Sequence, residues 1–539
     1  MSYRPGPWVS AVLALAAGAL AAVAHPPFGF LPGLLGYALL MHLVDEAPDA
    51  RPLRSAFWRG WLAAFAYFLI SCWWVAEAFM VDARGQGWMA PFAATLLPAV
   101  LGLFWGLAML AYRALKPKGP WRVLAFAGAL TAAEWARGHL LTGFPWNLPG
   151  ETWRAGSAMS QAASFAGAYG LTWITLAMAA AFAAPLGPAR GGGRGRFAPP
   201  VLAACVLIGL WAYGAARLRH PVAPIGPQPM VRIVQANVKQ EAKYTEDNLR
   251  TIFADYVDLT AAPARRPPDI VVWSEGAVPL SANELLAPGG GTAEAIARAM
   301  HPGETLLLGA YRVAGPADKP RYYNSLISVR EGPDGLDITG VYDKYRLVPF
   351  GEYLPAEQVL QPLGFKDLTH IGDSFTPGVL PGPLAPVGIP AVQPLICYEG
   401  LFPDLVRDAV RRTGRRPRWI VNVSNDSWFG VTSGPLQHLN QASYRAIEEG
   451  LPIVRSTPTG VSAVIDAYGR VAPGQSLGLN RLGVIDAALP AALPGSTYGR
   501  VGDAPLGILL AVSLIAALRS VWTRVSGSVV TIPRFWAKR

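Results

Sequence analysis

The residues needed for a disulfide framework are absent from this sequence. Its 539 residues include only three cysteines, a number that is both small and odd. Cys72 and Cys205 lie in apolar runs, so the polar part of the chain contains Cys397 alone. Cys397 is therefore expected to be a free thiol even in an oxidising compartment.

Charged residues are also scarce. They make up 15% of the chain, against 52% hydrophobic residues, whereas soluble proteins usually carry about a quarter charged residues. This composition is typical of a membrane protein with a more polar part, and the length favours two or more domains. The net charge of +11 does not indicate nucleic-acid binding, because most Lys and Arg lie in short loops between apolar runs.

Seven apolar runs precede the polar region, and most are close to the ~20 residues that a helix needs to cross a bilayer. They cover residues 5–24, 26–44, 60–76, 88–112, 123–141, 163–184 and 197–216. The first run could be a signal peptide, but the runs that follow at once favour a retained anchor. We predict a membrane domain over 1–220 with seven transmembrane helices, an eighth transmembrane helix over 501–522, and a basic cytoplasmic tail over 523–539.

The basic residues between these runs predict the orientation of the chain. Loops after the second, fourth and sixth runs are rich in Lys and Arg, and Arg519 with further basic residues follows the eighth run. By the positive-inside rule, these segments and both termini lie in the cytoplasm. Seven crossings then place the polar region on the outer side of the membrane.

The polar region, 227–491, is predicted to be an α/β domain in which helices cover two sheets, because short apolar strands alternate with helical patterns. Strands are predicted at 230–238, 270–273, 305–311, 325–329, 338–342, 391–396, 419–423 and 461–465, and helices at 246–261, 292–300, 403–412 and 435–449. Little regular structure is predicted over 345–378, and a loop of that length is usually functional. Within it, residues 347–375 are either a mobile lid that dips into the outer leaflet or a packed surface loop.

Cys397 lies at the turn between a predicted strand and a predicted helix. The apolar run 391–396 ends at this residue, and a helical pattern begins near Asp404. At such a turn a thiol can stand clear of the sheet and feel the positive end of the following helix. The alternative is a small buried hydrophobic residue, as most free cysteines are. This stretch alone supports the two interpretations equally.

Two other strand ends carry the charged groups that a thiol nucleophile needs. Glu275 follows the predicted strand at 270–273, and Lys344 follows the one at 338–342. If the three strand ends converge, Glu275 would accept the thiol proton, while Lys344 would lower the thiol pKa and stabilise an oxyanion. Taken singly, each of these two residues is more often a solvated residue at the rim of a sheet.

Together, the motifs around these residues resemble a known family. Trp-Ser-Glu275, Tyr-Asp-Lys344 and Ile-Cys397-Tyr-Glu resemble the Glu-Lys-Cys triad of the carbon–nitrogen hydrolase (nitrilase) superfamily. With membrane helices on both sides, nearly the whole chain resembles the apolipoprotein N-acyltransferase family. Further matches are Glu134-Trp-Ala-Arg-Gly, Leu141-Thr-Gly-Phe-Pro-Trp146, Leu347-Val-Pro-Phe-Gly-Glu352-Tyr and Val423-Ser-Asn-Asp-Ser-Trp-Phe-Gly430. One departure is Lys243-Tyr244, where the family commonly has Lys-Trp.

The resemblance implies an α-β-β-α sandwich on an eight-helix membrane base, and a two-step acyl transfer that uses no metal and no cofactor. Cys397 would take an acyl chain from a phospholipid, namely the sn-1 chain of phosphatidylethanolamine. It would pass this chain to the α-amine of diacylglyceryl-cysteine at the N-terminus of an apolipoprotein. Glu275 would be the general base, and Lys344 with a backbone N–H beside Cys397 would stabilise the oxyanion.

The resemblance also implies supporting residues and a location. Glu352 would orient Lys344 or shuttle protons. Tyr398, Glu399 and Tyr244 would shape the pocket, although Glu399 is nearly as well explained as a helix-start carboxylate. The protein would be a monomer in the bacterial cytoplasmic (inner) membrane, with the nitrilase-like catalytic domain on the periplasmic side and both termini in the cytoplasm.

Two other functions are compatible with parts of the sequence. A membrane-tethered amidase that hydrolyses a small amide would need only the triad, with water as the acceptor. A transporter or membrane scaffold that only binds lipoproteins would need no triad, but few charges lie within the membrane runs to form a transport pathway. Of those charges, Glu134 and Arg137 are three residues apart near the end of the fifth run and are expected to form a structural pair.

Overall fold

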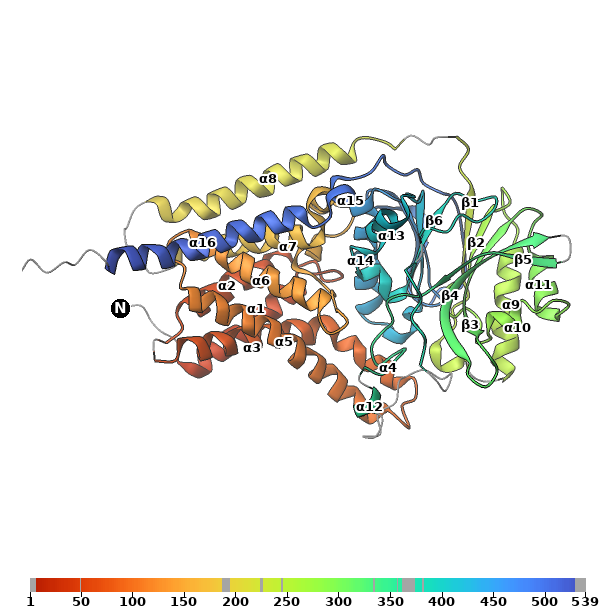
Figure 1. Ribbon diagram of the computed structural model, residues 1–539, viewed down its shortest axis with the longest axis horizontal. Helices are drawn as coiled ribbons and strands as arrows, with labels where there is room; N and C mark the ends of the chain where they lie inside the picture. The colour runs from red at the N-terminus through yellow and green to blue at the C-terminus, as the bar shows by residue number, and fades with distance from the viewer. Residues whose placement is uncertain are drawn as a thin grey trace, which may run out of the picture.

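The computed structural model describes residues 6–48, 50–186, 194–222, 226–243, 246–332, 335–355, 357–360, 374–380 and 382–528. The chain forms two parts that lie end to end, a bundle of helices and a layered α/β part (Figure 1). The chain enters the bundle, and its last helix leaves it, at the end remote from the layered part.

Eight helices build the bundle within the described residues, and each coincides with one of the apolar runs. They are α1 (Pro7–Val23), α2 (Leu35–Asp45), α3 (Pro52–Cys72), α5 (Ala90–Leu115), α6 (Trp121–His139), α7 (Ala163–Ala181), α8 (Ala198–Leu218) and α16 (Ala504–Ser528). A single helical turn, α4 (Glu77–Met80), lies between α3 and α5. Each of the eight predicted segments therefore contains a helix.

Among the described residues, four helical stretches are long and apolar enough to cross a membrane, judged by length and composition. These are Pro52–Met80, Gly87–Leu115, Met159–Ala181 and Ala198–Leu218. Three more apolar stretches are shorter, namely Pro7–Val23, Leu31–Asp45 and Ala504–Arg519. Helix α6 carries three charged residues, Arg122, Glu134 and Arg137, which make it less apolar than its neighbours.

Glu134 and Arg137 form the structural pair that their spacing predicts. Their side chains are fully buried and joined by an ion pair along one face of α6. The Nε1 atom of Trp105, on α5, donates a hydrogen bond to Glu134 over 2.6 Å, and Arg137 also donates to the backbone carbonyl of Phe144. The pair thus joins α6 to α5 and to the loop that follows α6.

Eleven strands form two sheets in the described part of the chain. They are β1 (Met230–Gln235), β2 (Ile270–Val272), β3 (Thr305–Ala314), β4 (Arg321–Gly332), β5 (Gly335–Asp343), β6 (Val392–Ile396), β7 (Trp419–Val423), β8 (Ile453–Ser456), β9 (Ser462–Ile465), β10 (Val471–Leu477) and β11 (Gly483–Ala488). The sheet orders are β11-β1-β2-β3-β4-β5 and β10-β9-β8-β7-β6. Parallel pairs occupy the middle of the first sheet and one half of the second, so their carboxyl ends point the same way.

Helices cover the outer face of each sheet, which gives the predicted α-β-β-α order of layers. The helices of this part are α9 (Glu246–Ala261), α10 (Ala282–Leu285), α11 (Gly291–Ala299), α12 (Glu357–Leu360), α13 (Leu405–Thr413), α14 (Gly434–Glu449) and α15 (Thr497–Val501). Helices α9 to α11 lie on the six-stranded sheet, and α13 and α14 lie between the five-stranded sheet and the bundle (Figure 1). Apolar side chains such as Ile233 of β1 and Val421 of β7 fill the space between the sheets.

The bundle and the layered part share one hydrophobic core. Leu171 of α7, Ile447 of α14 and Ile453 of β8 all belong to a single cluster of buried side chains. Helix α14 is therefore packed against membrane-type helices on one side and against the sheet on the other. Because this hydrophobic core is continuous, the bundle can hold the layered part in a fixed position relative to itself.

All eight predicted strands are present, but β8, β10 and β11 were missed. The loop predicted over 345–378 contains one short helix, α12. Residues 356 and 361–373 lie outside the described residues, so the central part of the predicted lid is not described.

Candidate active site

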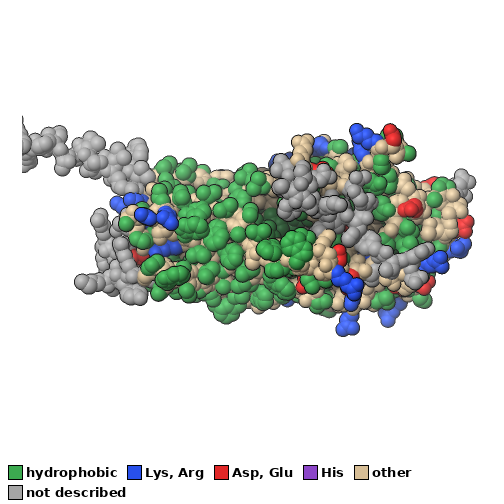
Figure 2. All heavy atoms as spheres, turned by 90° about the horizontal axis from the view of Figure 1, so that it is seen from below, with side chains coloured by type: hydrophobic (Ala, Val, Ile, Leu, Met, Phe, Trp, Pro, Cys, Tyr) green, Lys and Arg blue, Asp and Glu red, His purple; other side chains and the backbone are tan. Residues whose placement is uncertain are grey.

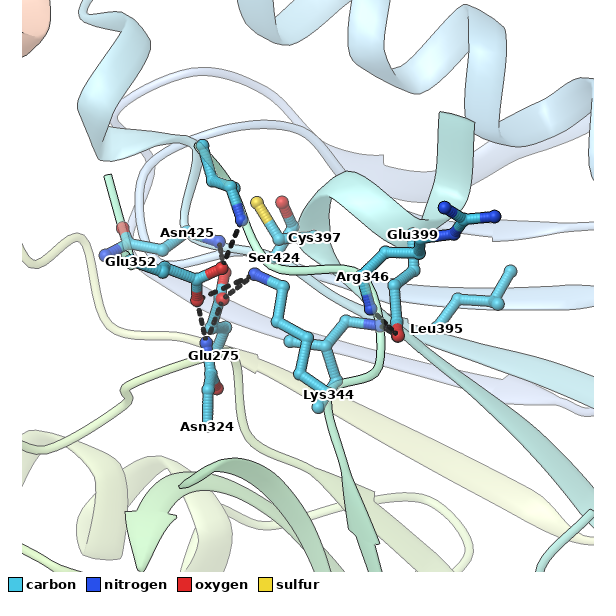
Figure 3. Close-up of polar contacts among 12 residues, drawn as sticks. Glu275, Asn324, Lys344, Arg346, Glu352, Leu395, Cys397, Glu399, Ser424 and Asn425 are labelled. Atoms are coloured by element: carbon cyan, nitrogen blue, oxygen red, sulfur yellow. Dashed lines mark hydrogen bonds and ion pairs between the residues drawn. The ribbon is translucent and has the colours of Figure 1, made fainter. Parts of the chain in front are cut away.

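Three strand ends bring Glu275, Lys344 and Cys397 into one site (Figure 3). Glu275 lies just beyond β2, Lys344 directly follows β5, and Cys397 directly follows β6. The Nζ atom of Lys344 lies 3.1 Å from the Oε1 atom of Glu275. The Cys397 side chain lies on the same side as these two charged groups. Since β2 and β5 belong to one sheet and β6 to the other, the site spans the carboxyl ends of both sheets.

The Glu275 carboxylate is held by three donors. Asn324 donates to Oε1 over 2.7 Å, the backbone N–H of Asn425 donates to Oε2 over 2.7 Å, and Lys344 pairs with Oε1. Burial by itself raises the pKa of Glu275, but the Lys344 ammonium and these hydrogen bonds hold it below its ordinary value. Glu275 is therefore ionised at neutral pH and can accept a proton.

Lys344 lies between two carboxylates. Its Nζ atom lies 2.9 Å from Oε1 of Glu352, in addition to its contact with Glu275. Burial lowers the pKa of Lys344, but the two carboxylates raise it well above the ordinary value. Glu352 is held in turn by Asn324 and by the backbone N–H of Val348, each over 2.7 Å. The orienting contact predicted for Glu352 is thus present, and Lys344 stays positively charged.

Cys397 occupies a backbone conformation that is rare for a residue with a side chain. Its φ is 49°, in the left-handed region, and such conformations concentrate at functional sites. Burial and the nearby Glu275 carboxylate raise the thiol pKa, and Lys344 lowers it by less. Lys344 thus lowers the thiol pKa, as predicted, but burial and the Glu275 charge outweigh it, so the net thiol pKa lies above its ordinary value. The thiol is protonated at rest and has to lose its proton to a base.

The sequence predicts that the Cys397 thiol feels the positive end of the following helix, but no α-helix begins directly beside Cys397. The residues after Cys397 form a single 3-10 turn, Cys397–Leu401, and α13 begins only at Leu405. The dipole of a full helix therefore does not start at the thiol.

Glu399 is a buried carboxylate whose oxygens are fully engaged by the protein. Its hydrogen-bond donors are the Tyr342 hydroxyl (3.0 Å) and the backbone N–H groups of Tyr345 (2.7 Å), Arg346 (3.1 Å) and Ile396 (2.8 Å). Burial raises the pKa of Glu399 to about 7. These contacts join the turn after Lys344 to the turn that carries Cys397. Glu399 therefore fixes the distance between the cation and the thiol.

Tyr398 links the site to the helical bundle. Its hydroxyl donates a hydrogen bond to the backbone carbonyl of Gly143, in the loop after α6. Its ring lies edge-on to Phe402, with 5.1 Å between ring centroids, and stacks at 6.5 Å on Phe144. The side chain predicted to shape the pocket thus forms part of the contact between the two parts of the protein.

The predicted Tyr244 lies outside the described residues. Its neighbour Lys243 is described and buried, and it donates a hydrogen bond to the Gly276 carbonyl over 2.8 Å. Burial lowers the pKa of Lys243 to about 8, although the Glu275 carboxylate acts in the opposite direction. Lys243 therefore adds a second, more weakly held positive charge near the base.

Sequence reasoning missed several polar residues around the triad. Asn324 bridges both carboxylates, and its backbone carbonyl accepts a hydrogen bond from the Lys344 N–H over 2.8 Å. Asn324 lies beside Lys344 because of the register in which β4 pairs with β5, and the sequence predicts both strands but not that register. Asn425 and Asp426 lie in the motif at 423–430, and the resemblance of this motif to the family implies no role for either residue. Across the described residues, no group of three or more His, Cys, Asp or Glu side chains is arranged to hold a metal ion.

The layered fold and the Glu–Lys–Cys site define a protein of the carbon–nitrogen hydrolase class. The family model described as Carbon-nitrogen hydrolase matches residues 230–497, and the one described as Apolipoprotein N-acyltransferase N-terminal domain matches residues 17–181. The chain is 54% identical to the apolipoprotein N-acyltransferase of Caulobacter vibrioides, covering 98% of each chain. It is 38% identical to those of Rhodopseudomonas palustris and Bradyrhizobium diazoefficiens, covering 95% of each chain. The chain belongs to the apolipoprotein N-acyltransferase family.

Among solved structures, a mutant amidase of the nitrilase superfamily from Nesterenkonia matches part of the chain. The two are 19% identical with a TM-score of 0.34, and the match covers 53% of this chain and 98% of that chain.

Proposed function

We propose that the chain N-acylates apolipoproteins in two steps, through a thioester on Cys397. Family membership over the whole chain supports the acyl transfer. The convergence of Glu275, Lys344 and Cys397 from three strand ends supports the assignment of the catalytic residues.

The first step transfers an acyl chain from a phospholipid to the sulfur. Glu275 takes the proton of the Cys397 thiol while Sγ attacks the ester carbonyl carbon. Lys344 and a backbone N–H beside Cys397 stabilise the negative charge on the carbonyl oxygen. When the carbon–oxygen bond breaks, the departing alkoxide takes the proton back from Glu275. The products are a lysophospholipid and S-acyl-Cys397.

The second step passes the acyl chain to nitrogen. The free α-amine of diacylglyceryl-cysteine attacks the thioester carbonyl, and Glu275 accepts a proton from the attacking amine. Lys344 again stabilises the oxyanion, and the carbon–sulfur bond breaks as the thiolate leaves. The proton held by Glu275 returns to Cys397. The result is an amide on the lipoprotein and a free thiol that is ready for another phospholipid.

The acyl donor is a phospholipid, and the family resemblance favours the sn-1 chain of phosphatidylethanolamine. Each of the proposed steps is completed by groups of the protein and its two substrates. The protein acts as a monomer, because one chain supplies all three catalytic groups from its own strands.

The proposed placement has eight transmembrane helices, in a domain over 1–220 and a C-terminal helix over 501–522. The catalytic domain, 227–491, then lies on the periplasmic side of the inner membrane, and the N-terminus and the tail over 523–539 lie in the cytoplasm. Figure 2 supports this placement: hydrophobic side chains cover the bundle, while Lys and Arg gather at its end remote from the layered part. Exposed apolar residues such as Ile208 of α8 and Ile515 of α16 form a surface that suits lipid.

This placement explains why a nitrilase-like site is joined to a membrane bundle. Both substrates are anchored in lipid, so the thiol has to work close to the headgroups. The Tyr398 contact with Gly143 holds the turn beside Cys397 directly against the bundle.

An acceptor assay tests the proposal. Purified full-length protein is incubated with phosphatidylethanolamine labelled in its sn-1 chain and with a diacylglyceryl-cysteine peptide. The proposal predicts label in an amide on the peptide, only when the peptide α-amine is free. Release of labelled free fatty acid at the same rate with and without the peptide would instead favour a membrane-tethered hydrolase.

A further inference from the structure

His438, on α14, lies directly behind the turn that carries Cys397. Its Nε2 atom is 3.2 Å from the backbone carbonyl oxygen of Cys397, and both residues are buried. A carbonyl oxygen can only accept a hydrogen bond, so Nε2 has to carry the hydrogen. His438 therefore donates to the backbone of the nucleophile.

The other side of the His438 ring is fixed by a buried ionic network. Its Nδ1 atom lies 3.0 Å from Oδ1 of Asp426 and 3.2 Å from the Nη2 atom of Arg455, from which the neutral ring with its hydrogen on Nε2 accepts a hydrogen bond. Oδ2 of Asp426 pairs with Arg455 at 2.7 Å. Ser424 donates to Asp426 over 2.7 Å. Arg455 also donates to Asn422, so the network joins β7 and β8 to α14. Every member is buried, which leaves the imidazole ring little freedom to move.

The contact matters because of the backbone conformation of Cys397. A residue with a side chain keeps a φ of 49° only where its surroundings enforce it. In a trans peptide, the Cys397 carbonyl and the Tyr398 N–H point in opposite directions. A donor that holds the carbonyl on the α14 side therefore directs this N–H away from His438. The same contact fixes where the Cys397 side chain leaves the backbone.

We propose that His438 is a positioning residue, whose Nε2–H holds the Cys397 carbonyl and thereby aims the sulfur at Glu275 and Lys344. This inference rests on the proposed function, in which Cys397 is the nucleophile. The hydrogen bond from His438 goes to the Cys397 backbone. It acts through the peptide group of the residue that reacts.

Helix α14 is itself held by the bundle on both sides of His438. Gln437 accepts a hydrogen bond from Trp146 over 2.9 Å, and Gln441 accepts one from the backbone N–H of Asn147 over 3.1 Å. The loop after α6 thus fixes the helix that carries His438. Gln441 is also a matched control, because it is buried on the same helix and contacts the bundle but not Cys397.

The test compares substitutions that keep or lose the Nε2 donor. The amide nitrogen of Gln can reach the position of Nε2, whereas that of Asn reaches only the position of Nδ1. Full-length variants in detergent are mixed with phosphatidylethanolamine, and the rate of thioester formation is followed by intact mass in a single turnover. The rate is measured at several phospholipid concentrations, which separates the maximal rate from the concentration that gives half of it. Thermal unfolding is measured for each variant.

We expect His438→Ala and His438→Asn to slow the maximal rate of thioester formation by about 10²-fold, the scale of a misplacement near 1 Å. The phospholipid concentration that gives half of the maximal rate should not change, because the phospholipid does not contact His438. His438→Gln should retain most of the rate. Gln441→Ala should lower thermal stability while leaving the rate within about twofold, which is far less than the 10²-fold misplacement effect.

Equal rates for His438→Gln and His438→Asn would overturn the inference, and this comparison holds even if His438→Ala fails to fold. A rate loss in Gln441→Ala equal to that of His438→Asn would also overturn it, because a loosened α14 would then explain both. Failure of the proposed function has a different signature. In that case the wild-type protein itself would form no thioester that depends on Cys397.

Discussion

The Oε1 atom of Glu275 lies 3.1 Å from the Nζ atom of Lys344, and both side chains are buried. Two opposite charges in such a place depend on each other, since removal of one partner leaves the other charge buried and unpaired. The two members of the pair also have different catalytic roles. The carboxylate can take a proton from the thiol, and the ammonium can face the oxyanion.

Lys344→Met should remove both the ion pair and the positive charge at the oxyanion. We expect the free energy of unfolding to fall by about 3–5 kcal/mol, because Glu275 and Glu352 would remain buried without their cation. Thioester formation should slow by about 10²- to 10³-fold. Thermal unfolding and single-turnover acylation check these outcomes. Lys319→Met, at an exposed lysine, is the control and should change neither quantity.

The ionisation of the Cys397 thiol should respond to its two charged neighbours in opposite directions. Burial and the Glu275 charge raise the thiol pKa, so Glu275→Gln should lower it. Lys344→Met should raise it further. The ultraviolet absorbance of the thiolate, taken as wild type minus Cys397→Ala across pH, measures both shifts. Glu275→Gln should nevertheless lose acylation, because its thiol has no general base. A Glu275→Gln variant with wild-type acylation would remove Glu275 from the mechanism.

Glu399 should make stability depend on pH. Its folded-state pKa, about 7, lies above the ~4.3 of an ordinary glutamate, so the folded protein binds this proton more tightly than the unfolded chain. The resulting stabilisation is complete below about pH 4.3 and is lost as pH rises to 7, by up to about 1.4 kcal/mol per pH unit. Glu399→Gln lacks this slope. The difference in melting temperature, wild type minus variant, should therefore be larger at pH 5 than at pH 7, and parallel pH profiles would contradict the assignment.

Tyr398→Phe should weaken the contact between the catalytic domain and the bundle while keeping the aromatic ring in place. The variant loses the hydroxyl that donates to Gly143, a change of about 1 kcal/mol in the free energy of unfolding. Its ring still packs on Phe402, so acylation should fall much less than in Tyr398→Ala. Equal acylation rates in the two variants would show that the ring packing does not matter.

The buried pair in α6 should be more sensitive to loss of one partner than to loss of both. Glu134→Leu alone leaves the Arg137 guanidinium unpaired and should destabilise the protein by about 3–5 kcal/mol. The double variant Glu134→Leu with Arg137→Met leaves no buried charge and should be the more stable of the two. Thermal unfolding in detergent decides the order. A double variant less stable than the single would mean that Arg137 is needed for its bond to the Phe144 carbonyl.

The convergence of the triad could be predicted because each member follows an apolar run at a strand end. Glu275 and Cys397 follow the buried strands β2 and β6, Lys344 follows the largely exposed edge strand β5, and the carboxyl ends of strands that run in the same direction meet at one edge. The bundle helices could be located for a similar reason, since long apolar runs leave few other structures available. Both predictions rest on local patterns that tertiary packing does not reverse.

The remaining features depend on contacts that no local pattern encodes. The strand β10 contains Pro473 and Gly474 and is largely exposed, so its sequence lacks the alternation of a half-buried strand. The upward shift of the Cys397 pKa comes from burial, which is decided by how the two sheets close over the thiol. His438 lies 41 residues from Cys397 on a helix predicted only as a covering element. Its contact with the nucleophile appears only once α14 is placed behind β6.

The central claim is that the sulfur of Cys397 carries the acyl chain, and intact mass tests it most directly. Wild type, Cys397→Ala and Glu275→Gln are exposed side by side to a phospholipid of one chain composition, with no acceptor present. We predict that wild type gains the mass of one acyl group, which neutral hydroxylamine removes, and that neither variant gains it. An acyl adduct of the same size on Cys397→Ala, or an unchanged wild-type mass while acceptor is still acylated on its addition, would contradict the account.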